Sequence, residues 1–68
     1  MMPMNHETTI EVDGEHYYLQ FYSVPSENDL PRLIEFARNT IRGIDRRPIM
    51  ATVEVDGVLV RICGPIED

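Results

Sequence analysis

Apolar residues recur at helical spacing in one stretch of the chain, residues 29–44. They are three and four positions apart, which at 3.6 residues per turn gathers them on one face of a helix. Polar residues occupy the remaining positions, so the pattern predicts one amphipathic helix that covers another layer of structure. The apolar positions of this predicted helix are Leu30, Leu33, Ile34, Ala37, Ile41 and Ile44.

Both ends of this helix have sequence signals. Ser26 can open a preliminary turn, and Pro31 favours a regular helix that begins at Asn28 or Asp29, because a proline further inside would remove a helix hydrogen bond. Gly43 predicts a left-handed residue just after the last helical turn. Residues 29–44 therefore form a complete helix in this interpretation.

Two segments on either side of the helix alternate between apolar and polar residues, as strands do. Asp13-Gly14 separates 7–12 from 15–22, and Asp56-Gly57 separates 49–55 from 58–63. A two-residue Asp-Gly connection between alternating runs is a strong hairpin signal. The sequence predicts one β-hairpin before the helix and one after it.

The two hairpins share the pattern Thr-x-Glu-Val-Asp-Gly, at residues 9–14 and 52–57. Strand propensity and turn chemistry favour these residue types in any hairpin, so two similar hairpins are the simpler explanation, and internal duplication is the alternative. Because opposed residues share a face, the register predicts which side chains point inward. These are Ile10, Val12, Tyr17, Leu19, Phe21, Ala51, Val53, Val55, Val58, Val60 and Ile62.

The element order predicts an α+β fold, a two-layer ββαββ sandwich in which one helix packs on one face of a four-stranded sheet. Because 58–63 is the most apolar strand, we expect it at the centre, parallel to the first strand. This order resembles the β-grasp domains of the immunoglobulin-binding and ubiquitin-like type, and the resemblance implies a mixed sheet. We expect a single domain over 1–68, with flexible tails at 1–6 and 64–68.

One helix leaves the other sheet face uncovered. Tyrosine, methionine and arginine are enriched at protein interfaces, so a face rich in them favours a partner or a second copy of the chain, whereas scattered surface apolar residues are the ordinary alternative. The residues expected on this face are His16, Tyr18, Tyr22, Met50, Thr52, Leu59, Arg61 and Cys63.

Charge narrows the class of partner. Twelve acidic residues against six arginines give a formal net charge of −6, which disfavours direct binding to nucleic acid and favours a basic protein, although solubility alone explains such a charge. The single cysteine, Cys63, excludes an intramolecular disulfide and fits a cytoplasmic location. No apolar run approaches the roughly 20 residues of a membrane span.

Catalytic and metal-binding patterns are weak. Glu11 opposite His16 is the nearest approach to an acid–base pair, and a surface ion pair is the commoner meaning of such neighbours. His6 and His16 near several glutamates lack the spacing of a metal site, and the chain has no Gly-rich phosphate loop. We therefore expect no enzyme and no cofactor.

The sequence thus predicts a small, acidic, non-enzymatic protein-binding module. Its sharpest form is an inhibitor that occupies the basic groove of a nucleic-acid-handling complex, of the kind known as phage anti-CRISPR or anti-restriction DNA mimics. The alternative is a self-associating domain, for example a homodimer, that uses the uncovered sheet face or an edge strand. The predicted partner-binding residues are Glu11, Asp13, Glu15, Tyr18, Tyr22, Glu54, Asp56 and Leu59.

Overall fold

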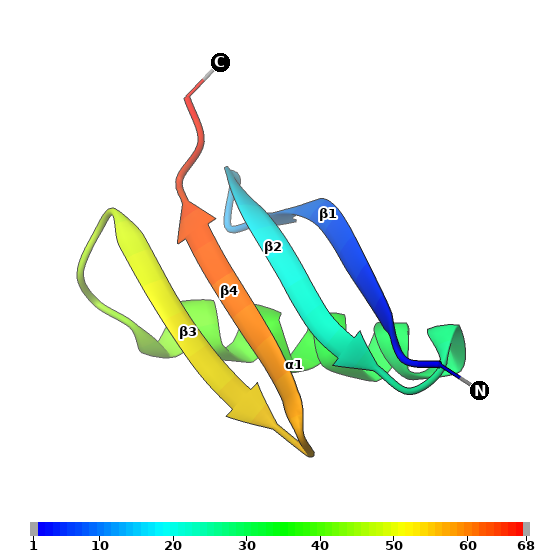
Figure 1. Ribbon diagram of the computed structural model, residues 1–68. Helices are drawn as coiled ribbons and strands as arrows, with labels where there is room; N and C mark the ends of the chain where they lie inside the picture. Colours follow the sequence, from blue (N-terminus) through cyan, green and yellow to red (C-terminus); the bar gives the residue numbers. More distant parts are fainter. Residues whose placement is uncertain (1, 68) are drawn as a thin grey trace.

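A computed structural model describes residues 2–67 of the chain (Figure 1). Four strands form one sheet, and a single α-helix crosses one of its faces, so the predicted two-layer α+β sandwich is confirmed. The elements are β1 (Met4–Val12), β2 (Glu15–Val24), the 3₁₀ turn η1 (Glu27–Asp29), α1 (Leu30–Gly43), β3 (Ile49–Val55) and β4 (Val58–Gly64).

The strand order differs from the β-grasp arrangement. The order is β1-β2-β4-β3 and every neighbouring pair is antiparallel, so the expected parallel pairing of the first and last strands is wrong. The apolar β4 does lie in the interior of the sheet, but its neighbour is β2. Placing β4 beside β2 keeps it buried without a parallel pair, and burial alone therefore could not choose between the two arrangements.

Both hairpins have the predicted register. Val12 pairs with Glu15 in the first, and Val55 pairs with Val58 in the second. The two turn residues have positive φ in each case, 53° and 85° at Asp13-Gly14 and 49° and 81° at Asp56-Gly57. This is the type I′ geometry whose twist matches that of the flanking strands.

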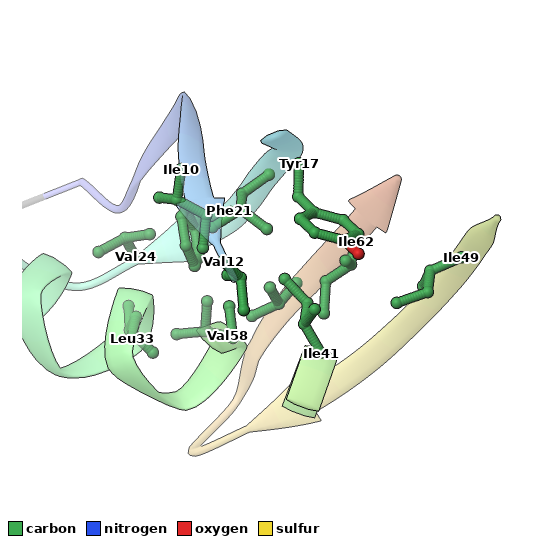
Figure 2. Close-up of a cluster of buried hydrophobic side chains, with 13 residues drawn as sticks. Ile10, Val12, Tyr17, Phe21, Val24, Leu33, Ile41, Ile49, Val58 and Ile62 are labelled. Atoms are coloured by element: carbon green, nitrogen blue, oxygen red, sulfur yellow. The ribbon is translucent and has the colours of Figure 1, made fainter. Parts of the chain in front are cut away.

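The core lies between α1 and the inner face of the sheet (Figure 2). Leu33, Ala37 and Ile41 of the helix are fully buried, as the amphipathic pattern predicts. On β3 only Ile49 is buried, whereas the next inward residues, Ala51, Val53 and Val55, stay half-buried. The sheet residues in the core are Ile10, Val12, Tyr17, Leu19, Phe21, Val24, Ile49, Val58, Val60 and Ile62.

Of the predictions for the two ends of the helix, one is confirmed and one is wrong. Ser26 caps the preliminary turn by accepting the backbone N–H of Asn28 at 3.2 Å, as expected. The prediction of a left-handed Gly43 is wrong, because Gly43 is the last helical residue and Ile44 is an extended C-cap. Arg47 supplies the reason: its guanidinium donates to the carbonyls of Ile41 and Ile44, so the helix end is satisfied without a left-handed residue.

The predicted tails are shorter than expected. Met4–His6 belongs to β1, and Gly64 belongs to β4. The backbone N–H of Ile66 donates to the carbonyl of His16 at 2.8 Å, so the chain continues beside β2 beyond the last strand. Backbone hydrogen bonds at residues 4–6 and 64 explain why the tails are shorter than predicted. Polar backbone groups favour a partner even where the side chains do not alternate. The outermost tail positions, Met1 and Asp68, lie outside the described residues.

Candidate functional site

The outer sheet face, opposite α1, is formed by alternate residues of all four strands. The register places Tyr18 beside Cys63, Gln20 beside Arg61, and Tyr22 beside Leu59 along the central pair β2–β4. None of these six residues is fully buried, and Leu59 is 47% exposed. The flanking strands contribute Glu7, Thr9 and Glu11 on one side and Met50, Thr52 and Glu54 on the other.

Part of the predicted site comes together on this outer sheet face. Tyr22, Leu59 and Glu54 occupy one row across three strands, and Tyr18 lies on the same side of β2. Met50, 81% exposed, extends the apolar area beside Cys63. These neighbours mix aromatic, aliphatic and charged groups, and tyrosine and methionine are among the residue types enriched at protein interfaces.

The predicted acidic residues do not form one patch. Because β2 and β4 run in opposite directions, the turns at Asp13 and Asp56 lie at opposite ends of the sheet (Figure 1). Asp56 accepts from Arg32 at 2.7 Å, and Asp13 lies 3.9 Å from Arg42. Arginines of α1 therefore partly neutralise both turns.

Glu15 and Glu11 fall on different sides of the sheet. Glu15 accepts a hydrogen bond of 3.2 Å from the hydroxyl of Tyr17, a core residue, so it belongs to the helix side. Glu11 lies on the outer sheet face opposite His16. Within residues 2–67 no ion pair joins Glu11 to His16, and no group of three potential metal ligands gathers there.

Glu7 is the centre of a polar cluster on the outer sheet face. Its Oε2 accepts from the hydroxyl of Tyr18 and, at 3.4 Å, from the side-chain amide of Gln20. The hydrogen bond from Tyr18 to the Glu7 carboxylate favours the neutral phenol and so raises the pKa of Tyr18 above its ordinary value of 10.0. Glu7 retains its second oxygen for another donor.

A pocket of about 450 Å³ opens beside Glu7. It lies where the β1–β2 register shifts, between Met4 and His6. Ser23 adopts a positive φ of 63° at this irregularity, and its N–H donates to the Asn5 side chain at 3.2 Å. The bulge thus widens the strand pair and aims polar groups into one recess. The lining residues are Asn5, His6, Glu7, Gln20, Phe21 and Tyr22.

Sequence reasoning omitted Glu7 and Gln20 from the predicted site. The register alone placed them opposite one another, as the structure does. What the alternation did not contain was the bulge, since a single extra residue in β2 leaves no compositional mark. Asn5 was missed because residues 1–6 were predicted to form a tail.

The chain matches no protein-family model, no curated protein and no solved structure. Within residues 2–67, no helix is both long enough and apolar enough to cross a membrane.

Proposed function

We propose that this chain is a small non-enzymatic protein-binding module whose outer sheet face contacts a partner with a basic surface. The observation that carries the proposal is the pocket beside Glu7, which combines a carboxylate with the rim residue Tyr22 on an uncovered sheet. Tyr18 and Leu59 extend the contact surface toward the centre of the sheet. A protein partner fits this arrangement better than a small molecule, because most of the lining residues are polar, whereas small-molecule sites are lined mainly by apolar and aromatic side chains.

The pocket has the chemistry to receive an arginine or lysine side chain. The free carboxylate oxygen of Glu7 accepts an N–H donor, the Asn5 and Gln20 amides lie in the same lining, and the ring of Tyr22 offers an aromatic surface. A guanidinium can use all three, since it has five N–H donors for the free Glu7 oxygen and the amide oxygens, and it stacks on aromatic rings. The proposal thus gives the basic partner a specific point of attachment.

The sharpest form of the proposal is the inhibitor that occupies a basic groove in place of nucleic acid, as phage anti-CRISPR or anti-restriction mimics do. Glu7 and Glu11 support it, since they share the outer side of β1 and can face a basic wall together. Asp13 and Asp56 contribute less, because arginines of α1 lie beside them. The groove contact therefore centres on β1 and β2 rather than on the turns.

The proposal includes neither catalysis nor a cofactor, and it places the protein in the cytoplasm. A surface that recognises a basic side chain needs no reacting group, and Glu11 beside His16 has no nucleophile in its row of the sheet. Cys63 is a free, half-buried thiol, which is the state favoured in a reducing compartment.

The test is an affinity pull-down from nuclease-treated lysate of the native host, with bound proteins identified by mass spectrometry. Any recovered partner is then titrated with the purified chain and with the Glu7→Gln/Glu11→Gln double variant. We expect the double variant to bind at least about tenfold more weakly, because two charge-assisted contacts are worth about 1.5–3 kcal/mol each.

The matched control is Glu27→Gln/Glu35→Gln. It removes the same charge from exposed residues of η1 and the solvent side of α1. Equal weakening by both double variants would replace a specific site with a net-charge effect, and unchanged affinity in the outer-face variant would refute the proposal. Displacement of the partner by duplex DNA would support the mimic, and indifference to DNA would leave only the general binding module.

A further inference from the structure

We propose that two copies of this chain associate through the free edge of β3, in antiparallel register about Thr52. This goes beyond the outer sheet face, because edge pairing extends a sheet without covering either face. The two edges of the sheet are β1 and β3, and each presents one row of backbone donors and acceptors. The two edges differ in sequence and in regularity.

The β1 edge carries features that discourage pairing. Its register with β2 shifts between Met4 and His6, and Glu7 and Glu11 place two charges along it. Bulges and edge charges are the devices with which proteins block strand addition. The β3 edge has neither an irregular pairing nor a proline, glycine, lysine or arginine over Ile49–Val55. Only Glu54 is charged there, so β3 is the edge open to a further strand.

The backbone groups on this edge follow from the turn. Val55 and Val58 flank a two-residue type I′ loop, and such a pair exchanges both backbone hydrogen bonds. Alternation then directs the N–H and C=O groups of Met50, Thr52 and Glu54 away from β4. These six groups need water or a partner strand.

Thr52 is the middle one of the seven residues of β3. An antiparallel pair centred there overlaps the whole strand and satisfies all three outward residues on each copy. Glu54 then faces Met50 of the second copy, so the carboxylates do not oppose each other. A register shifted by one residue would leave part of the strand unpaired, and a second copy of this chain therefore fits the edge in one preferred register.

Burial on the inner face favours the same occupant. Ala51, Val53 and Val55 point toward the helix side of the sheet but remain half-buried, unlike the core residues of β2 and β4. In the Thr52-centred pair, Val53 lies beside Ala51 of the second copy, and Val55 lies beside Ile49. Cross-strand apolar pairs of this kind stabilise a sheet, so each copy supplies the neighbours that the other lacks.

The decisive variant is Thr52→Lys, with Thr9→Lys as its matched control. Thr9 occupies the equivalent position of the shared hairpin pattern on the exposed side of β1. Two lysines meet at the two-fold axis only in the first variant, where like charges directly opposite each other should raise the dissociation constant about fivefold. Sedimentation velocity at protein concentrations from about 10 μM to about 1 mM measures this dissociation constant.

The register has its own test in a Cys63→Ser background. Thr52→Cys should form an intermolecular disulfide on mild oxidation, because hydrogen-bonded antiparallel partners have Cα atoms about 5.5 Å apart, within the range for disulfides. Thr9→Cys should remain monomeric. Amide hydrogen exchange at Thr52 and Glu54 should slow as protein concentration rises, while exchange at Val53 should not change with it.

A parent chain that is monomeric across the whole concentration range would overturn the proposal. So would a dimer that Thr9→Lys dissociates, since that places the contact at β1. Dissociation by Leu59→Glu with resistance to Thr52→Lys would assign the contact to the outer sheet face instead. A dimer without a Thr52→Cys cross-link would refute the register.

Discussion

The two hairpins begin from the same pattern and end in different environments. In the first, Thr-x-Glu-Val-Asp-Gly ends β1, where Val12 is 3% exposed in the core. In the second the pattern ends β3, where the equivalent Val55 stays half-buried. Both stretches form edge strands with the same turn geometry. The difference in burial arises from tertiary packing, because α1 covers the inner face of β1 more completely than that of β3.

Arg38 shows how closely the helix layer approaches β1. Its guanidinium donates at 2.6 Å to the backbone carbonyl of Glu11, the residue before Val12 in β1. At the other end of the helix, Arg32 contacts Asp29 at 3.6 Å and the turn residue Asp56 at 2.7 Å, and neither of these lies in a strand. Similar local sequence therefore gives the same hairpin geometry, while the position of α1 decides which of the two strands joins the core and which keeps a free surface.

The largest expected effect concerns Gly64, where the second hairpin packs against Tyr17 of the first. Gly64 has a φ of 148°, and an added Cβ would lie 2.8 Å from Tyr17 Cδ2 and 3.0 Å from the His16 carbonyl. Gly64→Ala should lower the free energy of unfolding by about 3 kcal/mol, because both the backbone conformation and the contact are unfavourable. Urea denaturation measures this value.

Gly43→Ala is the control for that variant. Gly43 is helical, and its added Cβ would meet nothing within 4 Å. This change should raise the free energy of unfolding by about 0.5–1 kcal/mol, as alanine does in helices. Similar losses in the two variants would mean that the close contact between β4 and Tyr17 is not what makes Gly64 necessary.

The next effect compares the equivalent valines directly. Val12→Ala should cost about 2 kcal/mol of unfolding free energy, because it opens a cavity in a buried site, whereas Val55→Ala should cost less than about 1 kcal/mol. Thermal and urea unfolding at low protein concentration measure both in the monomer. Equal costs would contradict the difference in burial, and a Val55→Ala cost that grows with concentration would favour the β3 pairing.

The smallest effect concerns the two turn aspartates. Asp56→Asn removes the charge that lies 2.7 Å from Arg32, and Asp13→Asn removes one 3.9 Å from Arg42. Asparagine tolerates positive φ, so the turns should persist in both variants. The first change should cost about 0.5 kcal/mol and the second almost nothing, since exposed ion pairs contribute little. Repeating the unfolding in 1 M salt, roughly ten times the common ionic strength, should abolish the difference.

Local features of the fold were predictable from sequence. The turns, the hairpin registers, the capping by Ser26 and the buried helix positions all depend on residues close together in the chain. The order of strands was not, because β4 is equally apolar beside β1 or β2. The end of α1 was also missed, since Arg47 reaches its carbonyls from a loop that has no periodic pattern.

The candidate site was predictable only as a set of faces. Alternation placed Tyr18, Tyr22 and Leu59 on the uncovered side, and the structure places them there. The opposite placement of the two acidic turns follows both from the expected parallel pairing of the first and last strands and from the observed antiparallel β2–β4 pairing. Alternation did not reveal the pocket beside Glu7, which depends on one irregular position in β2.

The β2–β4 pairing also has a kinetic consequence. Each hairpin closes through a two-residue turn and can form within microseconds, as can the helix. The pairing of Tyr18 with Cys63 instead closes a loop that contains the rest of β2, the helix, β3 and most of β4. Joining the two preformed hairpins along this seam is therefore the entropically costly step, and it sets how fast the chain folds. Until β2 and β4 pair, the two hairpins are independent units that are joined only by the chain between them.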